Sequence, residues 1–218
     1  MQRGALFVYD EVEIRKRNKL PHWHARNGIY FVTYRLADSL PLEYETKIAN
    51  AISYERKRLF NEGLREDELE EAVARFAFAR TQPLLDRGFG SCILRREECA
   101  EEVMRCWRFD DDSAYSLVAE CVMPNHVHVV FRLRCESDIS DVVKQWKSIT
   151  SHNLGRLTGS GGTVWQDDYY DVLLRDERQL RNTIEYVMKN PARAGLSEWK
   201  WTRFSPDALA AIVGDVTR

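Results

Sequence analysis

Two histidines, His126 and His128, stand one residue apart in the segment MPNHVHVVF. Residues two apart on a β-strand point to the same face, so a strand here presents two imidazoles side by side. Val127 and Val129 then point to the opposite face, where they can pack in a core. Neutral imidazole is a common ligand of divalent metals, so the pattern is typical of half a metal site.

A second element must supply the remaining ligand and the reacting group, and the segment EYVMKNPARAGL offers Tyr186 and Asn190. Residues four apart on a helix lie on one face. Two imidazole nitrogens and a carboxamide oxygen leave positions open for water and a phosphate oxygen, which suits magnesium or manganese. Such an ion would orient a phosphate for in-line attack, and the phenol of Tyr186 can act as the nucleophile.

Each of these signals also has a purely structural interpretation, because helical tyrosines commonly pack in cores and Asn-Pro commonly ends a helix. Tyr169 and Tyr170 are rival nucleophiles, but they lie in a predicted strand and no carboxamide follows either at helical spacing. A second pair, His22 and His24, flanks Trp23 next to a proline. We expect that pair in a loop, with a packing or hydrogen-bonding role.

Composition is typical of a soluble globular chain of 218 residues, with 44% hydrophobic and 30% charged residues. No apolar run reaches the roughly 18 residues that a membrane span requires, and the N-terminus does not resemble a signal peptide. The five cysteines form no CxxC pair, which favours reduced thiols in the cytoplasm. The net charge of −2 does not by itself indicate nucleic-acid binding, and the acidic excess lies in residues 41–112.

The order of predicted elements is strand, helices, hairpin, helix, strand, helix, which favours an α+β protein with helices packed on an antiparallel sheet in a ferredoxin-like arrangement. The predicted strands span residues 29–36, 115–122, 126–133 and 168–174, and the helices span 42–60, 66–82, 96–108, 138–157 and 176–189. The last helix is expected to stop near the Asn-Pro pair. Residues 1–28 form an N-terminal arm or loop, residues 29–203 a single domain with a helical insertion region at 42–108, and residues 204–218 a C-terminal tail.

Several segments together resemble the REP-associated tyrosine transposases of the HUH single-tyrosine transposase superfamily, which are IS200-like. The segments are LPHW, FVTYRLADSLP, LDRGFGSCILR, VMPNHVHVVF, QWKSITSHNLGR, VWQDDYYDVLLRD and EYVMKNPARAGL. The resemblance runs from about residue 20 to about residue 203. MPNHVH, WQDDYYD with a following RD, and the YxxxNPxRAGL pattern are specific when they occur together in this order.

The resemblance implies the HUH variant of the ferredoxin-like fold and a DNA-nicking and strand-transfer enzyme. His126 and His128 match the metal ligands, and Tyr186 matches the nucleophile that forms a 5′-phosphotyrosine and frees a 3′-hydroxyl. Asn190 takes the position of the third ligand, where related insertion-sequence transposases carry a glutamine.

The same resemblance implies the partners and the location. The substrate is single-stranded DNA near a palindromic hairpin, the metal is magnesium or manganese, and no nucleotide cofactor or membrane is involved. The resemblance favours a monomer over a dimer. It also implies a bacterial cytoplasmic protein whose DNA substrate is in the nucleoid.

Basic and polar residues on the predicted helix 138–157 are candidates for contacts with DNA phosphates, and two further candidates follow Tyr186. The candidates are Lys144, Lys147, Ser151, Arg156, Lys189 and Arg193. Trp146 on the same helix is expected in the core, and Trp165 is expected to be a packing anchor.

Two other functions remain open at this stage. One is a non-catalytic protein that binds hairpin DNA on the same scaffold. The other is a ferredoxin-like RNA-binding module, which would need exposed aromatic rings such as Phe131 and Tyr115 on its central strands and would leave the histidines unexplained.

Overall fold

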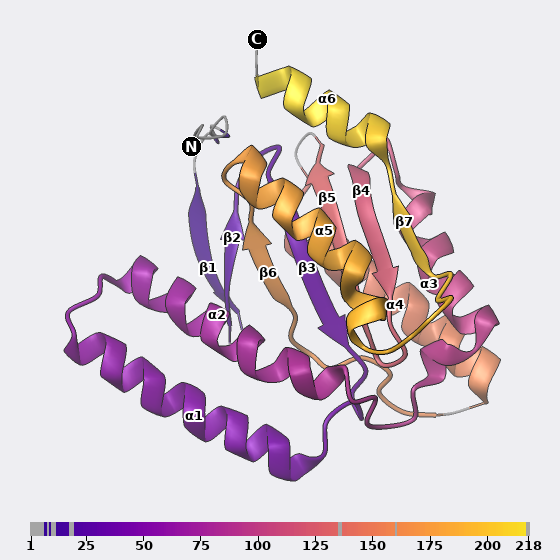
Figure 1. The fold of residues 1–218 in the computed structure, drawn as a ribbon, viewed down its shortest axis with the longest axis horizontal. Coiled ribbons are helices and arrows are strands. Elements are labelled where there is room, and N and C mark those ends of the chain that lie inside the picture. Colours follow the sequence, from indigo (N-terminus) through magenta and orange to yellow (C-terminus); the bar gives the residue numbers. More distant parts are fainter. Residues whose placement is uncertain are drawn as a thin grey trace.

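A five-stranded antiparallel sheet with the strand order β6-β3-β5-β4-β7 forms the centre of the molecule (Figure 1). The computed structural model describes residues 7, 9, 12–17, 20–134, 137–159 and 161–216. The strands are β3 (Ile29–Arg35), β4 (Tyr115–Val122), β5 (His126–Leu133), β6 (Tyr170–Leu173) and β7 (Thr202–Phe204).

Two helices complete the predicted ferredoxin-like arrangement. α3 (Glu97–Phe109) lies between β3 and β4, and α4 (Ile139–Thr158) lies between β5 and β6. The resulting β-α-β-β-α-β order and the strand order β6-β3-β5-β4 are those of a ferredoxin-like sheet. The prediction of an α+β fold with an antiparallel sheet is therefore confirmed.

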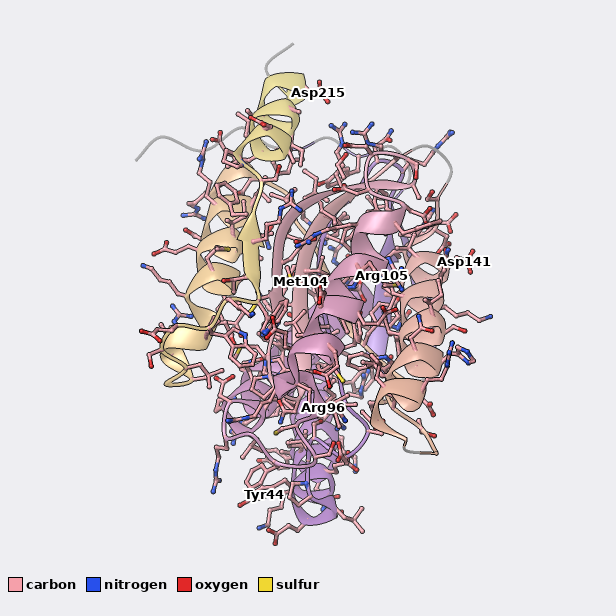
Figure 2. All side chains as sticks on the ribbon, turned by 90° about the vertical axis from the view of Figure 1, so that its right-hand side faces the viewer. Tyr44, Arg96, Met104, Arg105, Asp141 and Asp215 are labelled. Atoms are coloured by element: carbon pink, nitrogen blue, oxygen red, sulfur yellow. The ribbon has the colours of Figure 1, made fainter. Side chains whose placement is uncertain are left out.

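The two faces of the sheet are covered by different helices. Val127, Val129 and Phe131 of β5 belong to the apolar core that includes Trp107 of α3 and Trp146 of α4. Figure 2 shows α3 and α4 on one side of the sheet and the helix α5 (Glu177–Arg193) on the other. Because side chains alternate along β5, the histidines lie on the face that α5 covers.

Helices α1 (Leu42–Asn61) and α2 (Glu66–Leu85) lie side by side as a hairpin at one edge of the molecule (Figure 1). Leu59, Leu69 and Val73 form a small core between them, separate from the two cores of the sheet. Arg56 and Glu70 form an ion pair across the same interface. A short 3₁₀ turn at Ile93–Arg95 precedes α3. The helical insertion predicted within residues 42–108 is thus this hairpin, and α3 is part of the basic fold.

The segments predicted as an N-terminal arm and a C-terminal tail contain regular secondary structure among their described residues. The expected N-terminal arm contains β1 (Glu13–Arg17) and β2 (Leu20–His24), which pair with each other, so His22 and His24 lie on a strand and not in a loop. The backbone N–H of Trp23 donates to Asp171 of β6, which ties this strand to the main sheet. The expected C-terminal tail contains the last residue of β7 and then α6 (Pro206–Val216), whose Ile212 is buried against the sheet.

Helix α5 does not stop at the Asn-Pro pair, and this prediction was wrong. Pro191 lies inside the helix, which ends at Arg193, and the N–H of Ala194 still donates to the carbonyl of Asn190 (3.1 Å). Because proline has no N–H, the helix loses the hydrogen bond to the carbonyl of Val187, but only two further residues follow before the helix ends. Asn190 is consequently held in helical geometry, four residues after Tyr186.

Cys92, Cys99, Cys106 and Cys121 are free thiols, as predicted, and Cys135 lies outside the described residues. None of the helices in the described part of the chain is long and apolar enough to cross a membrane.

Candidate functional site

His126 and His128 are fully buried on the central strand β5, where His128 pairs with Thr33 of β3 and Cys121 of β4. The Nδ1 atom of His126 lies 2.8 Å from Oδ1 of Asn125, and Nδ1 of His128 lies 2.7 Å from Oγ1 of Thr33. Burial lowers the pKa of His126 to about 3 and that of His128 well below its ordinary value, so both rings are neutral.

The Nε2 atoms of both histidines face one side chain that the sequence interpretation did not include, Gln82 near the end of α2. The amide nitrogen of Gln82 lies 3.0 Å from Nε2 of His126 and 3.3 Å from Nε2 of His128. Because this NH₂ group donates to Nε2, the ring proton of each histidine is on Nδ1, where Asn125 and Thr33 accept it. Both imidazole lone pairs therefore point into the same small volume.

Asp86, one turn beyond Gln82, adds a carboxylate to this volume. Its Oδ1 atom accepts from the Gln82 amide (3.0 Å) and lies 3.9 Å from Nε2 of His126. Burial raises the pKa of Asp86, and Gln82 and Arg193 act in the opposite direction. No group of three His, Cys, Asp or Glu side chains with metal-site geometry occurs among the residues that the structure describes.

Tyr186 approaches the histidines from α5, as the sequence predicts for a nucleophile on a second element. Its ring centroid lies 5.5 Å from that of His128 and 5.9 Å from that of Phe31. Burial raises the pKa of its phenol, and the charge of Asp86 acts in the same direction, whereas Arg193 and Asn190 act against it. The guanidinium of Arg193 lies over the Tyr186 ring, 5.4 Å from its centroid.

Three polar atoms of Gln82 and of helix α5 are buried without a hydrogen-bond partner. They are Oη of Tyr186, Oδ1 of Asn190 and Oε1 of Gln82. Leaving a buried polar group unpaired costs roughly 1–3 kcal/mol, so such groups commonly mark a site that another species completes. Of the three, the Gln82 atom belongs to the side chain that contacts both imidazoles, and the Tyr186 atom to the ring that packs on His128.

The rival tyrosines have other neighbours. Tyr169 stacks on His22 (centroids 4.2 Å apart). Tyr170 stacks on Phe78 of α2 (4.3 Å) and lies 6.3 Å from Phe31. Tyr186 is thus the tyrosine whose ring contacts a histidine of β5.

The predicted DNA-contacting residues fall on two different faces. Those of α4 lie on the helix that covers the apolar face, across the sheet from Tyr186: Lys144, Lys147, Ser151 and Arg156. The ammonium group of Lys147 already makes two hydrogen bonds within the protein, because its Nζ donates to the carbonyls of Gln166 (2.5 Å) and Asp167 (2.6 Å). On α5, Lys189 pairs with Glu185, and only Arg193 lies beside the phenol.

The aromatic rings required for the RNA-binding alternative are buried. Phe131 is 0% exposed and Tyr115 is 1% exposed, and both pack against Trp146. Bases cannot stack on rings that a helix covers, so Phe131 and Tyr115 do not form the stacking surface that this alternative requires. The core position predicted for Trp146 is confirmed, and Trp165 is likewise buried, with its N–H donating to Thr150 (2.8 Å).

Two cavities border the candidate site, and the Phe78–Tyr170 stack contributes to the walls of both. One, of about 580 Å³, lies between α2, β6 and α5 and reaches Tyr186. Its cationic lining residues are Arg75, Arg175 and Arg178. The other, of about 450 Å³, lies between the helical hairpin and β3, and Gln82 and Thr33 line it.

Comparisons with known proteins find similar sequences. The model of the family described as "Transposase IS200 like" matches residues 94–190. A Haemophilus influenzae protein, named as a candidate REP-associated tyrosine transposase, is 26% identical over 112 residues, which is 45% of this chain and 64% of the relative.

Solved structures of transposases are also similar to this chain. A REP-associated tyrosine transposase bound to a REP hairpin is 16% identical, with a TM-score of 0.48 and coverage of 85% of this chain and 82% of that chain. A candidate transposase from Deinococcus radiodurans is 14% identical, with a TM-score of 0.39 and coverage of 81% and 96%. The predicted resemblance is confirmed: over residues 94–190, which include both histidines, Tyr186 and Asn190, this chain is similar to the IS200-like transposases.

Proposed function

We propose that the chain is a metal-dependent enzyme that nicks and transfers single-stranded DNA through a covalent link to Tyr186. The observation that carries the proposal is the convergence of Tyr186 from α5 with His126 and His128 from β5, at 5.5 Å between the rings of Tyr186 and His128. A nucleophile beside two neutral imidazole lone pairs is an arrangement suited to phosphoryl transfer. The match of this segment to the IS200-like transposases supports the same reaction class.

The residues present fit a divalent cation. His126 and His128 would hold it through Nε2, and the carboxamide oxygen of Asn190 would be the third protein ligand, since it is buried and unpaired. Nitrogen and oxygen donors of this kind suit magnesium or manganese. When bound, the ion supplies Lewis-acid polarisation of the scissile phosphate.

The protein's own groups carry the rest of the chemistry. The Oη atom of Tyr186 forms a bond to phosphorus, the bond from phosphorus to the 3′ oxygen breaks, and the phenol proton ends on the released 3′-hydroxyl. Arg193 over the ring favours the phenolate, against the effect of burial. The phosphotyrosine conserves the phosphodiester bond, so the reverse step can join another 3′-hydroxyl without a nucleotide cofactor.

The substrate proposed is single-stranded DNA beside a palindromic hairpin, in keeping with the REP association in the name of the Haemophilus influenzae relative. The cavity that reaches Tyr186 carries Arg75, Arg175 and Arg178 together with the carboxylates of Glu71, Asp171 and Asp176, and Arg175 pairs with Glu71 (3.5 Å). Arg75 and Arg178 are the arginines proposed to contact the phosphate backbone. We include a monomeric state in the proposal, which size-exclusion chromatography with and without hairpin DNA can test.

The test compares wild-type protein with the Tyr186→Phe variant on end-labelled hairpin DNA from the flanks of the gene, with magnesium, manganese or EDTA. We expect a metal-dependent cut and a covalent protein–DNA band in the wild type, and neither in the variant. Tyr170→Phe tests the rival nucleophile, and Tyr54→Phe on the exposed surface of α1 is the matched control. A covalent band that persists in Tyr186→Phe would contradict the proposal.

A second candidate, a non-catalytic protein that binds hairpin DNA, is favoured by the closure of the site, because Oη of Tyr186 is buried and α2 covers the histidines. Hairpin binding without a cut under any metal condition would support it. A single-stranded RNA of the same sequence, included in the same assay, measures the preference for DNA.

A further inference from the structure

We infer that the inserted helical hairpin of α1 and α2 is an autoinhibitory cover, which closes the metal site in the chain without DNA and must move before metal and DNA enter. In the closed state the amide of Gln82, near the end of α2, contacts the Nε2 atoms of both β5 histidines. This inference rests on the proposed function and adds a regulatory step to it. The helical hairpin lies outside residues 94–190, the part of the chain that matches the family model.

The first argument is that a hydrogen bond and a metal compete for the same atom. A neutral imidazole has one lone pair in the plane of its ring, on the nitrogen that carries no proton. The amide nitrogen of Gln82 lies 3.0 Å from Nε2 of His126 and 3.3 Å from Nε2 of His128, so it donates to both lone pairs. An ion bound at the same lone pairs would face the amide protons. Metal binding therefore requires the Gln82 amide to leave.

The second argument is that a phosphate cannot reach the reacting groups in the closed state. Both β5 histidines are fully buried, and Oη of Tyr186 is buried as well. Phe78, one turn before Gln82 on α2, stacks on Tyr170 and lies edge-on to the Tyr186 ring, with 6.1 Å between the centroids. Rotation of the Gln82 side chain alone frees the lone pairs but leaves these aromatic contacts in place. A phosphate that meets both the metal and the phenol needs the end of α2 to move.

The third argument is that the helical hairpin can move as one unit. It has its own small apolar core and an ion pair between its two helices. The two segments that connect it to the rest of the chain touch each other, because the N–H of Ser91 donates to the Asp38 carboxylate (2.7 Å) and Gly90 lies against the Asp38 carbonyl. A Cβ atom at Gly90, where φ is +83°, would overlap that carbonyl oxygen, so glycine allows this approach. Both connections thus leave from a single point, about which the helical hairpin can pivot.

The fourth argument identifies what displaces the cover. Two ion pairs hold the helical hairpin closed, and in each the carboxylate belongs to the helical hairpin and the arginine to the rest of the chain. Arg35 of β3 pairs with Glu45 of α1 (2.7 Å), and Arg175 pairs with Glu71 of α2 (3.5 Å). Each of these arginines lines one of the two cavities at the site. DNA phosphates compete with the carboxylates for the same guanidinium groups, so single-stranded DNA opens the cover.

The first test is a titration of the DNA-free chain with Mn²⁺, in which electron paramagnetic resonance measures the free ion. We expect Gln82→Ala to bind Mn²⁺ about tenfold more tightly than wild type, because the ion no longer has to displace two hydrogen bonds. Gln145→Ala on α4, across the sheet, removes a contact with Asp110 and should bind Mn²⁺ like wild type. Unchanged or weaker binding by Gln82→Ala would contradict the inference.

His126→Ala keeps the inference separable from the proposed function. If this variant binds Mn²⁺ like wild type, the proposed metal site is wrong and the inference fails with it. If it loses Mn²⁺ while Gln82→Ala binds no more tightly than wild type, the inference alone is wrong. Thermal unfolding in EDTA shows whether each variant is folded, and the ion-pair variants below test the cover without a change at Gln82.

The second test breaks the two ion pairs that close the cover. A variant with both Glu45→Gln and Glu71→Gln should bind Mn²⁺ and single-stranded hairpin DNA about fivefold more tightly than wild type. Glu55→Gln with Glu62→Gln is the matched control, since it removes the same charge but both carboxylates pair with Arg58 within α1. Equal gains in the two double variants would assign the effect to charge alone, and the inference would be wrong.

The third test measures the movement itself with spin labels on two exposed positions, Tyr54→Cys on α1 and Phe109→Cys on α3, in a chain that also carries Cys92→Ser and Cys135→Ser. The distances between the labels should shift by several ångströms when hairpin DNA from the flanks of the gene and Mg²⁺ are added. If the DNA binds in a mobility-shift assay and the distances do not change, the helical hairpin is not a displaceable cover. If the DNA does not bind, the proposed function fails together with the inference.

Discussion

Two histidine pairs with the same spacing occur in this molecule, and the structure treats them in opposite ways. His126 and His128 lie on β5, and His22 and His24 lie on β2, so each pair presents both rings on one face of a strand. His22 is nearly as buried as the β5 pair, at 4% exposure against 0%. Burial alone therefore does not distinguish them.

The two histidine pairs differ in the groups that contact their imidazole nitrogens, and therefore in pKa. His22 pairs through Nδ1 with the buried carboxylate of Asp171, and its Nε2 lies 3.4 Å from Oδ1 of Asp168. Burial lowers the pKa of His22, but the two carboxylates outweigh it and raise the pKa to about 9. His126 and His128 have a neutral amide and a hydroxyl at Nδ1, and their pKa values fall.

The comparison shows that the groups hydrogen-bonded to Nδ1 decide the charge of a histidine in each pair. Carboxylates turn His22 into a cation that holds β2 to β6, and no lone pair is left for a metal. Neutral acceptors keep His126 and His128 as neutral imidazoles whose Nε2 lone pairs face the Gln82 amide, and a neutral imidazole is the form that can bind a metal.

The largest expected effect is on cleavage. His128→Ala should reduce nicking of hairpin DNA to the level of a sample without protein, because one of the two imidazole ligands is removed. His24→Ala, the same change at the same position of the other pair, should leave nicking unchanged. A gel-based cleavage assay checks both variants, and equal losses in the two would mean that the pairs do not differ in function.

The next effect is on stability. His22→Ala leaves the Asp171 carboxylate buried without its cation, which should lower the free energy of unfolding by about 3 kcal/mol. Urea denaturation measures this difference. His24, whose Nδ1 lies 3.5 Å from Asp138 in a half-buried position, provides the control, because His24→Ala should cost no more than about 1 kcal/mol. If His22→Ala is as stable as wild type, the pair with Asp171 does not stabilise the fold.

The same pair predicts a dependence of stability on pH. The pKa of His22 is raised to about 9 in the folded protein, above the ordinary value of 6.5, so its stabilising effect is complete below pH 6.5 and is lost as the pH rises through 9. The free energy of unfolding should fall by about 3 kcal/mol over this interval.

Asp171→Asn is the matched variant for this pH profile. An amide removes the buried negative charge that holds the proton on His22, so the fall between pH 6.5 and 9 should become much smaller. Equal slopes in wild type and variant would assign the pH dependence to other groups.

The sequence alone predicted the strands and helices whose apolar residues recur with a clear strand or helix period. β4, β5 and the helices α1 to α4 lie within two or three residues of their predicted bounds, because their apolar positions follow the strand or helix period. It failed where a long-range contact overrides a local signal. Pro21 favours a loop, yet the contact of Trp23 with Asp171 holds β2 in place.

Gln82 was missed for the same reason. Its histidine partners are 44 and 46 residues away in the sequence, and a glutamine on a charged helix has the composition of a solvated residue. A signal was present in its spacing of four and eight residues from Phe78 and Ala74, which places it on the apolar face of α2. That spacing predicts burial, but only the packing of α2 on β5 identifies what Gln82 touches.

The smallest expected effect isolates the Nδ1 partner, the feature in which the two histidine pairs differ most directly. Thr33→Val keeps the shape of the side chain but removes the Oγ1 atom that accepts from Nδ1 of His128 (2.7 Å). Without this acceptor, the ring proton is no longer fixed on Nδ1, and the Nε2 lone pair is available for a smaller fraction of the time. Mn²⁺ affinity should fall by about tenfold, since groups that orient a metal-binding histidine typically contribute this much. Thr33→Ser retains the acceptor and should bind Mn²⁺ like wild type. If Thr33→Val does so as well, the Gln82 amide alone is sufficient to orient His128, and the contrast with His22 lies in the absence of a carboxylate and not in the presence of a hydroxyl.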